Sequence, residues 1–577
     1  MALFGIMKSS INIPSLLPQF PCRKAELSDR LSSFKLNSLP TGNKWAIADQ
    51  SPSSTTPFKN FDCLCKNMEG ELKLYKNVLK KVGENYSVKG FYMVDAMQRL
   101  NIDYYFQQEI DEFLATQYSI FSSTYASGYG GQDLHELSLL FRLLRQQGHY
   151  VPAEVFEKFT GKEGKFCREK VGGDIKGMID LYEASQLRMA GEDILDEAEQ
   201  FSGKMLKEII SASNGFDKAE FVKSTLEQPF HKSLPIFTCR NLFHGTHGLN
   251  GWVNALQDLA KMNFNMLQST YQTEILHTSK WWTELDLEKE LKYARNQPLK
   301  WYIWSIACLT DPSLSEERLE LTKAISFIYI LDDIFDIYGT LEELTLFTKA
   351  VTRWDIEATE ELPDYMKIGF KALYDLTNEI SYKVYLKHGW EPSLSLRKAW
   401  VSLCEAFLIE AEWFASGKVP SAEEYLKNGI VSSGVHIAVI HIFFLLGQSI
   451  TKESVDKIDN SPTIISSTAT ILRLWDDLGS AEDENQEGRD GSYIECAMKK
   501  EKMSRERARE VVMAKISDAW KSLNRETILG NIFGSSFTKA SLNLARMVPL
   551  MYNYDHNQCL PKLEAHVKCL LYDHVPL

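Results

Sequence analysis

Three aspartates at helical spacing are the first feature of this sequence that suggests chemistry. Asp332, Asp333 and Asp336 directly follow an apolar turn, and Asp332 and Asp336 are four residues apart. At this spacing two carboxylates share one face of an α-helix, and their oxygens suit Mg²⁺ that also keeps water and phosphate ligands. A solvated helix end would explain the same pattern, so this motif alone does not decide between a metal site and a surface.

A second acidic face follows later in the chain. Asp476, Ser480 and Glu484 stand at positions i, i+4 and i+8, directly after an apolar run that ends at Trp475. Two carboxylates and a hydroxyl stacked over two helical turns form a mixed oxygen site for Mg²⁺, facing the first cluster across a helical bundle. Because both patterns together are improbable by chance, the pair predicts a metal site rather than two solvated helix faces.

The elements that position these residues are predicted to be helices. From about residue 66 onward apolar residues recur at spacings of three and four, as in Leu137, Leu140, Phe141 and Leu144. The sequence contains no sustained alternation of apolar and polar residues, which would indicate a strand. The pattern therefore predicts an all-α protein.

The length predicts more than one domain. A chain of 577 residues is too long for a single hydrophobic core. The segment from Pro229 to Gly251 is the least helical interior stretch, since it is rich in proline and glycine, and it places a domain junction near residue 250. We expect an N-terminal arm over residues 1–60, a helical domain over 61–250 that supports and caps the second domain, and a metal-binding catalytic domain over 251–577.

Composition excludes several classes of protein. A net charge of −13 argues against a general nucleic-acid binder. The ten cysteines match no zinc pattern and imply no disulfide framework. The longest apolar run, Val435–Leu446, contains His436 and His441 and is shorter than the roughly 20 residues of a membrane span, so it predicts a core helix. We expect a monomer with no nucleic-acid partner and no membrane span.

The first 60 residues differ in kind from the rest. They are rich in serine and basic residues, and Glu26 and Asp29 are the only acidic residues up to Trp45. This composition resembles an organellar transit peptide and predicts a plastid location. The alternative is an arm that the mature protein retains, which would favour the cytoplasm.

After residue 60 the chain resembles the plant class I terpene synthases over essentially its whole length. Asp332–Asp336 matches the aspartate-rich motif of that family, and Asp476, Ser480 and Glu484 match its second metal motif. The resemblance implies an N-terminal α-barrel-like domain, a C-terminal class I terpenoid synthase helical bundle and three Mg²⁺ ions, with Mn²⁺ as the alternative ion. Its substrates would be geranyl or farnesyl diphosphate.

Further landmarks of the family agree in order and spacing. The resemblance implies a metal-associated carboxylate, two arginines that bind diphosphate, a tryptophan at the pocket floor, and a broken helix whose carbonyls face a carbocation. The matching residues are Glu410; Arg295 and Arg473; Trp304; and Ser432, Ser433 and Gly434. Asp332, Asp336 and Asp476 would also contact the diphosphate through the metal ions.

Two departures from the family pattern bear on the product. The Arg-x-Arg motif keeps Arg295 but has Gln297 in place of the second arginine; Lys300 is a candidate replacement, and a solvated lysine is the alternative. The chain also has no Arg-Arg pair, whereas cyclising monoterpene synthases carry one before an N-terminal tryptophan. In the absence of this pair the chain resembles the acyclic linalool/nerolidol synthase subfamily.

The expected reaction is therefore ionisation followed by capture of water. Geranyl diphosphate would give linalool, and farnesyl diphosphate would give nerolidol. The alternatives are an acyclic hydrocarbon such as myrcene or ocimene, a cyclic monoterpene, and more distantly a prenyltransferase or a non-catalytic helical protein. A class II cyclase is disfavoured because the acidic cluster Asp193–Glu197 lacks the Asp-x-Asp-Asp pattern and indicates a helix face.

Several aromatic residues are candidates for the pocket wall. Trp304 would stabilise a cation through its π face. Trp301, Tyr302 and Phe327 are candidate neighbours, for which ordinary core packing is the simpler interpretation. Near the end of the chain, the lid or pocket wall of the family matches Tyr552, Tyr554 and Asp555, and a plain surface loop is the alternative for the last two.

Overall fold

The fold is known from a computed structural model. It describes residues 57–126, 132–161, 164–171, 174–212, 216–243, 251–291, 294–480, 491–554 and 560–576. Helices supply all the named elements of these residues, and a single isolated bridge pairs Thr160 with Phe166. The prediction of an all-α protein is confirmed.

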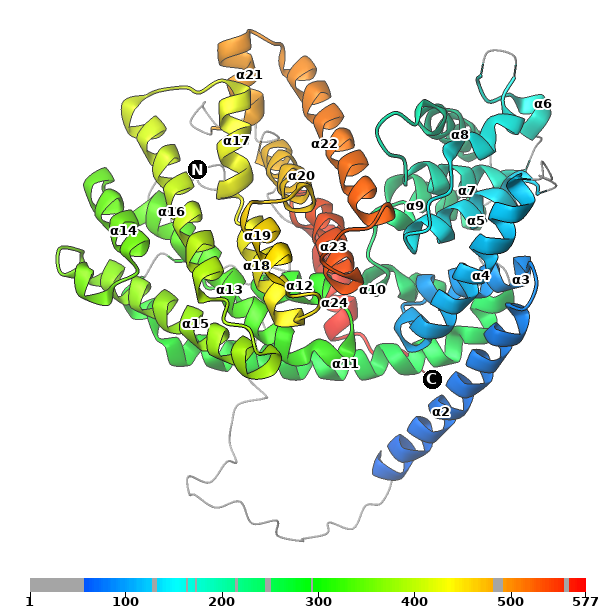
Figure 1. The fold of residues 1–577 in the computed structure, drawn as a ribbon, viewed down its shortest axis with the longest axis horizontal. Coiled ribbons are helices and arrows are strands. Elements are labelled where there is room, and N and C mark those ends of the chain that lie inside the picture. The colour runs from blue at the N-terminus through cyan, green and yellow to red at the C-terminus, as the bar shows by residue number, and fades with distance from the viewer. Residues whose placement is uncertain are drawn as a thin grey trace.

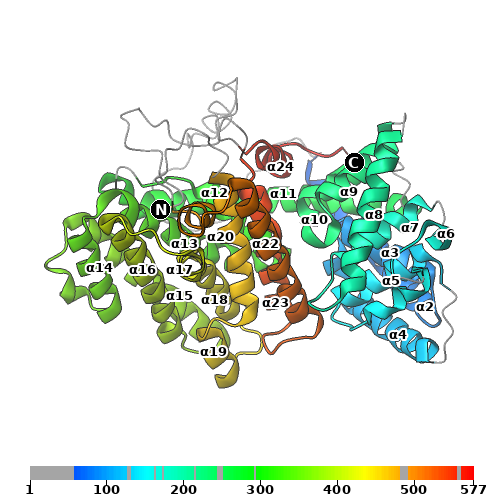
Figure 2. The same ribbon diagram turned by 90° about the horizontal axis from the view of Figure 1, so that it is seen from above.

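Two helical bodies lie side by side (Figures 1 and 2). The α-helices of the N-terminal body are α2 (Pro57–Val82), α3 (Val88–Arg99), α4 (Gln107–Ala126), α5 (Leu134–Gln146), α6 (Arg168–Val171), α7 (Ile175–Ser185), α8 (Asp193–Ala212), α9 (Phe216–Glu227) and α10 (Pro235–Thr238). Short 3₁₀ turns connect them, namely η1 (Asp103–Phe106), η2 (Ala153–Phe159), η3 (Phe230–Lys232) and η4 (Cys239–Leu242).

The second body contains all the sequence-predicted metal residues that the structure describes. Its α-helices are α11 (Gly251–Leu285), α12 (Pro298–Cys308), α13 (Ser315–Asp333), α14 (Leu341–Arg353), α15 (Asp364–His388), α16 (Ser393–Ser416), α17 (Ala422–Ser432), α18 (Val435–Leu446), α19 (Lys452–Asp459), α20 (Thr463–Ser480), α21 (Tyr493–Glu501), α22 (Arg505–Ile528), α23 (Ser535–Met551) and α24 (Pro561–Leu571). The short turns are η5 (Leu287–Lys289), η6 (Pro312–Leu314), η8 (Ile356–Thr359) and the π-helical turn η7 (Ile334–Tyr338).

Helix α11 packs against both bodies. It contacts α2 and α3 on one side and α12, α13 and α24 on the other. The end of the chain is fastened to it, because the Asn265 side chain exchanges two hydrogen bonds with the backbone of Val575, at 2.8 and 3.1 Å. Gln272 adds a bond to the Leu571 carbonyl at 2.6 Å. The boundary at residue 250 stays a prediction, since α11 serves both bodies.

A buried asparagine joins the two bodies. Asn524 of α22 donates from Nδ2 to the carbonyl oxygens of Gln186 and Arg188, both at 2.9 Å. Its Oδ1 lies 2.8 Å from Nε2 of His231, which is also buried. Burial and the nearby Arg546 guanidinium hold the pKa of His231 well below its usual range, so this imidazole is neutral.

The acidic cluster Asp193–Glu197 is a helix face, as the sequence indicates. It forms the first turn of α8, and Asp196 reaches across to α22. One oxygen of Asp196 lies 2.8 Å from Nε of Arg188, and the other lies 2.8 Å from Nζ of Lys521. The cluster therefore contributes to the contact between the two bodies.

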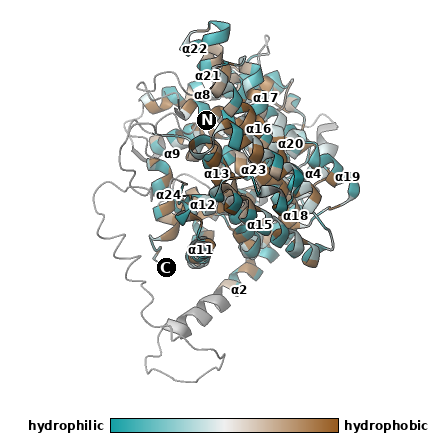
Figure 3. Ribbon diagram, turned by 90° about the vertical axis from the view of Figure 1, so that its left-hand side faces the viewer, coloured by the Kyte–Doolittle hydropathy of each residue, from teal (hydrophilic) through white to brown (hydrophobic). Residues whose placement is uncertain are grey.

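Helix α18 runs through the core, where hydrophobic residues gather in Figure 3. Residues 422–446 are the one described stretch long and apolar enough to cross a membrane, but 78% of its apolar window is buried inside the protein. His436 and His441 bond to the carbonyls of Ala399 and Ile437, and burial lowers the pKa of both histidines to about 4. The packing of α18 agrees with the prediction of a core helix, and its two histidines are neutral.

A buried ion pair ties α11 to α13 and yields a test of stability. Glu274 accepts two bonds from Arg318, at 2.8 and 2.7 Å, and one from the Tyr302 hydroxyl at 2.7 Å. Glu274→Gln leaves the Arg318 charge poorly compensated, so we expect a loss of about 3–5 kcal/mol in the free energy of unfolding, measured by urea denaturation. Glu284→Gln, which breaks an exposed pair with Lys280, should change it by less than about 0.5 kcal/mol. Equal losses in both variants would contradict this account.

Candidate active site at the mouth of an apolar cavity

The first aspartate cluster spans the end of α13 and a π-helical turn. Asp332 and Asp333 close α13, while Asp336 lies in η7. The sequence predicts a regular α-helix with Asp332 and Asp336 one turn apart, and the structure corrects this with a wider turn. The wider turn buries both Ile334 and Phe335, and Phe335 packs against rings from α14 and α16.

Arg295 binds the first cluster directly. Its guanidinium contacts Asp332 through Nη2 at 2.5 Å and Asp333 through Nε at 2.8 Å. Its backbone N–H donates to the second oxygen of Asp333 at 2.7 Å. Burial raises the pKa of Asp333 to about 6, an increase that Arg295 opposes. Asp333 therefore faces Arg295, and Asp332 is the aspartate of this cluster that lines the cavity described below.

The second acidic face is held by an arginine and a tyrosine. Asp476 of α20 receives a bond from Arg473 Nη2 at 2.9 Å, and Nη1 of the same arginine reaches the Tyr425 hydroxyl at 3.3 Å. Tyr425 in turn donates to Asp477 at 2.8 Å, and the Tyr493 N–H donates to the other Asp477 oxygen at 2.9 Å. The side chain of Ser480 and all of Glu484 lie outside the described residues.

Sequence reasoning missed Tyr425 and Asp477. Asp477 is fully buried, and burial raises its pKa to about 7, although Arg473 lowers it. The doubled aspartate after an apolar run was an available signal, because only one of two adjacent residues on this helix can face the cavity. Tyr425 carried no such signal, since its position depends on how α17 packs against α20.

The two acidic faces interact across the bundle. Burial raises the pKa of Asp476, Arg473 lowers it, and the charge on Asp332 raises it. Burial also raises the pKa of Asp336 to about 6, and the charges on Asp332 and Glu410 contribute to this increase. Carboxylates from α13, η7, α16 and α20 therefore share one negative field, which favours cations.

Glu410 of α16 is oriented by the neighbouring helix. Its Oε1 accepts bonds from the Ser432 hydroxyl at 2.6 Å and from the Asn428 amide at 3.0 Å. Both donors lie on α17, which begins with a capping box between Ser421 and Glu424. The start of α17 is thus set locally, and its last turn presents two donors to Glu410.

The predicted helix break lies between α17 and α18. Gly434 has φ +71°, a left-handed conformation that ends the hydrogen-bonded ladder. A Cβ at this position would lie 2.4 Å from Cγ2 of Ile328, so glycine is also required by the close approach of α13. Among the described residues no donor contacts the carbonyl oxygens of Ser432 and Ser433, both of which line the cavity.

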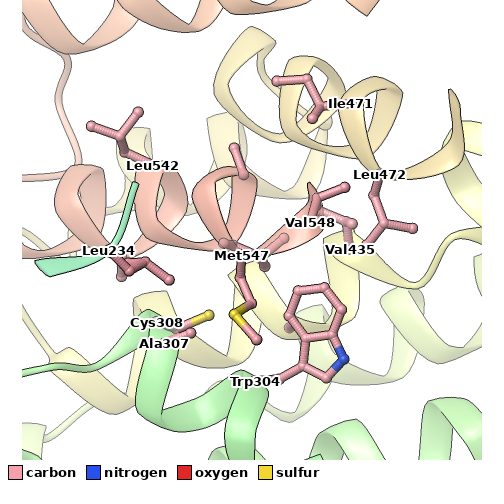
Figure 4. Packing of buried hydrophobic residues seen from close by; sticks show 14 of the residues in the cluster. Leu234, Trp304, Ala307, Cys308, Val435, Ile471, Leu472, Leu542, Met547 and Val548 are labelled. Carbon is pink, nitrogen blue, oxygen red and sulfur yellow. The ribbon is translucent and has the colours of Figure 1, made fainter. Parts of the chain in front are cut away.

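An apolar cavity lies beneath the acidic faces. The space between the atoms is about 650 Å³, including the part that is open to solvent. Figure 4 shows Trp304 and Cys308 of α12 below Val435 and Leu472. The remaining lining residues are Ile325, Ile328, Tyr329, Asp332, Phe407, Ser432, Ser433, Gly434, Ala438, Arg473, Leu544 and Tyr552.

Of the two lining aromatics that the sequence analysis missed, Phe407 and Tyr329, it is Tyr329 that contacts charged and polar residues of the site. Its hydroxyl accepts a bond from Trp304 Nε1 at 3.1 Å, and the Arg295 guanidinium stands 4.7 Å from its ring centroid. The signal was its place three residues before Asp332, which puts both on one face of α13. Tyr552 completes this wall, with its ring 6.4 Å from that of Trp304.

Not all the predicted aromatics reach the cavity. Trp301, Tyr302 and Phe327 are fully buried and do not line it, so for them the simpler interpretation of core packing is correct. Tyr554 is half-buried close to the second face, where burial and Asp476 raise its pKa. Asp555 lies outside the described residues.

The oxygen donors of the site suit a hard divalent ion that a substrate also binds. Asp332, Asp336, Glu410 and Asp476 offer only carboxylate oxygens. Within the described residues no three acidic, histidine or cysteine side chains come close enough to hold an ion alone. Ions at such a site need further oxygen ligands, which water and a diphosphate supply.

Sequence comparisons agree with this arrangement. The metal binding domain of the terpene synthase family matches residues 283–522, and the N-terminal domain of terpene synthases matches residues 46–226. An (E)-nerolidol synthase of Cannabis sativa is 54% identical over 87% of this chain and 91% of its own length. The chloroplastic S-(+)-linalool synthase of Arabidopsis thaliana is 48% identical over 87% of each chain.

A solved structure supports the same fold. Isoprene synthase from grey poplar, in complex with three Mg²⁺ ions and dimethylallyl-S-thiolodiphosphate, superposes with a TM-score of 0.81. The two sequences are 34% identical, and the match covers 90% of this chain and 98% of the other.

The helix break yields a test with a matched control. Gly434→Ala should cost about 1–2 kcal/mol for the left-handed backbone and about 1–3 kcal/mol more for the contact with Ile328. Gly389 has the same φ of +71° but no atom within 4 Å of its Cβ position, so Gly389→Ala should incur only the first cost. Urea unfolding measures both variants. If they lose the same stability, the close approach of α13 does not constrain position 434.

Proposed function

Because the chain belongs to the terpene synthase family, we propose that it ionises geranyl or farnesyl diphosphate with Mg²⁺ and adds water to the cation. The products are the acyclic alcohols linalool and nerolidol. The observation that carries the proposal is the pair of acidic faces, around Asp332 and Asp476, at the mouth of a largely apolar cavity. A diphosphate and a hydrocarbon chain need those two environments side by side.

The charged residues bind and orient the diphosphate. Bound Mg²⁺ ions supply Lewis-acid stabilisation of the leaving oxygens. Asp332, Asp336, Asp476 and Glu410 hold the ions, together with Ser480, Glu484 and Asp333 from the two sequence motifs. Arg295 and Arg473, which here pair with these carboxylates, are the guanidinium groups that would donate to the phosphate oxygens.

The cavity residues protect the carbocation after the carbon–oxygen bond breaks. Trp304 and Tyr329 present π faces, which attract a cation. The carbonyl oxygens of Ser432 and Ser433 add negative dipole ends. The remaining wall is largely apolar and limits access of water. Addition of water to C3 of the allylic cation therefore competes with loss of a proton from the cation.

Two observations support an acyclic alcohol over the other outcomes. The sequence lacks the Arg-Arg pair of the cyclising monoterpene synthases. Relatives that are 54% and 48% identical are named for nerolidol and linalool. Acyclic hydrocarbons and cyclic monoterpenes are the alternative products, and prenyltransferase activity is the more distant alternative.

We propose a monomer in the plastid, in line with the chloroplastic linalool synthase and with a transit peptide in residues 1–60, which lie largely outside the described residues.

Product analysis tests the reaction. The protein without its first 50 or so residues is incubated with geranyl or farnesyl diphosphate, and the volatiles are separated and identified. We expect linalool and nerolidol as main products with Mg²⁺, and none after EDTA. Cyclic main products would contradict the acyclic assignment, and activity undiminished by EDTA would contradict the metal site.

A single carboxamide substitution tests the role of the first acidic face. Asp332→Asn keeps the size of the side chain but removes its charge, so kcat/KM should fall about 100-fold or more, as when a group that stabilises transition-state charge is lost. Asp375→Asn, on the exposed face of α15, serves as the control and should keep wild-type kcat/KM. Loss of helical circular dichroism in Asp332→Asn would instead indicate a structural role for this aspartate.

A further inference from the structure

We propose that Lys300 is a third cationic residue that binds the diphosphate of the substrate, held at the cavity mouth by the ring of Tyr329. The inference rests on the proposed function and adds a substrate-binding residue to it. It follows from the position of Lys300, from its surroundings and from how the other cations of the site are engaged.

Lys300 stands in the first turn of α12, four residues before Trp304. Residues at this spacing share a helix face, and Trp304 lines the cavity, so Lys300 lies one turn closer to the start of the helix on the cavity side. Its Nζ is 5.9 Å from the ring centroid of Tyr329, another lining residue. Lys300 is not itself a lining residue, but it stands next to one and within the influence of Asp476, close to where the diphosphate is expected.

The same ring organises a second cation. The Arg295 guanidinium carbon lies 4.7 Å from the Tyr329 centroid, and the Tyr329 hydroxyl is fixed by Trp304. Two positive groups thus share one aromatic ring, although their charges repel each other. An anion between or above them would compensate for that repulsion.

Lys300 differs from the two arginines in its partners. Arg295 is engaged by Asp332 and Asp333, and Arg473 by Asp476. In the described part of the chain, Lys300 forms no ion pair or hydrogen bond; the Tyr329 ring is the contact that it makes. A half-buried ammonium group without an anionic partner is costly, which favours binding of an external anion.

Electrostatics agree with this position. Burial lowers the pKa of Lys300 to about 8, the Arg295 charge lowers it further, and the Asp476 charge raises it. The ammonium group therefore remains mostly protonated near neutral pH. It senses Asp476 of the second acidic face and Arg295, which pairs with Asp332 of the first.

The lysine side chain suits a leaving group that moves. Its ammonium is a compact charge on a flexible stem with three donors, whereas a guanidinium binds best in one planar orientation. Lys300 can follow the diphosphate oxygens from the intact substrate to the released inorganic pyrophosphate. The predicted ligand class is therefore a diphosphate, either esterified or free.

Binding of inorganic pyrophosphate in the presence of Mg²⁺ tests the proposal by titration calorimetry, without any turnover. Lys300→Gln should weaken this binding about 10- to 100-fold, as expected for the loss of a hydrogen bond to a charged group. Lys300→Arg should bind within about threefold of the wild type, since it retains the charge. Lys371→Gln removes an exposed lysine of α15 and should bind as the wild type does.

Steady-state kinetics with the prenyl diphosphates provide the second readout. The KM of Lys300→Gln should rise about as much as its pyrophosphate dissociation constant, while circular dichroism stays that of the wild type. If Lys300→Gln binds pyrophosphate as tightly as Lys371→Gln does, Lys300 does not bind the diphosphate, and the proposed function stands. If the wild type neither binds pyrophosphate with Mg²⁺ nor releases it from a prenyl diphosphate, the proposed function fails, and this inference fails with it.

Discussion

The burial of several carboxylates around one opening is the constraint on which the site depends. Asp332, Asp336, Glu410 and Asp476 come from different helices, and their mutual repulsion in a largely dry setting opposes folding. Arg295 and Arg473 offset that repulsion in the absence of metal. The two arginines thus have a structural role of their own, apart from the role toward the diphosphate that we propose for them.

Hydrogen bonds to neighbouring helices fix the positions of these charged residues. Asp477 lies behind Asp476 and fixes Tyr425, which supports Arg473. On the other side Ser432 and Asn428 fix Glu410 at the point where α17 ends. The helix break therefore has two consequences, since it leaves the carbonyl oxygens of Ser432 and Ser433 without a donor among the described residues and sets the turn that holds a carboxylate.

Local patterns in the sequence predicted most of the frame. Helical spacing predicted the all-α fold, and the short apolar run predicted the core position of α18, while the break at Gly434 was predicted from the resemblance to the family. The π-helical turn was not predictable from spacing, because it results from the packing of Phe335 against two other helices. Tyr425 was missed for a similar reason: its partner Asp477 is 52 residues away, and such contacts leave no local signal.

The attachment of Val575 to α11 has a consequence for biogenesis. Helix α11 packs against both bodies, yet its Asn265 and Gln272 side chains find their hydrogen-bond partners in α24 and the residues after it. During synthesis the central helix emerges long before those partners do. The early chain therefore exposes Asn265 and Gln272 to water, and final consolidation around α11 waits until residues 560–576 have left the ribosome.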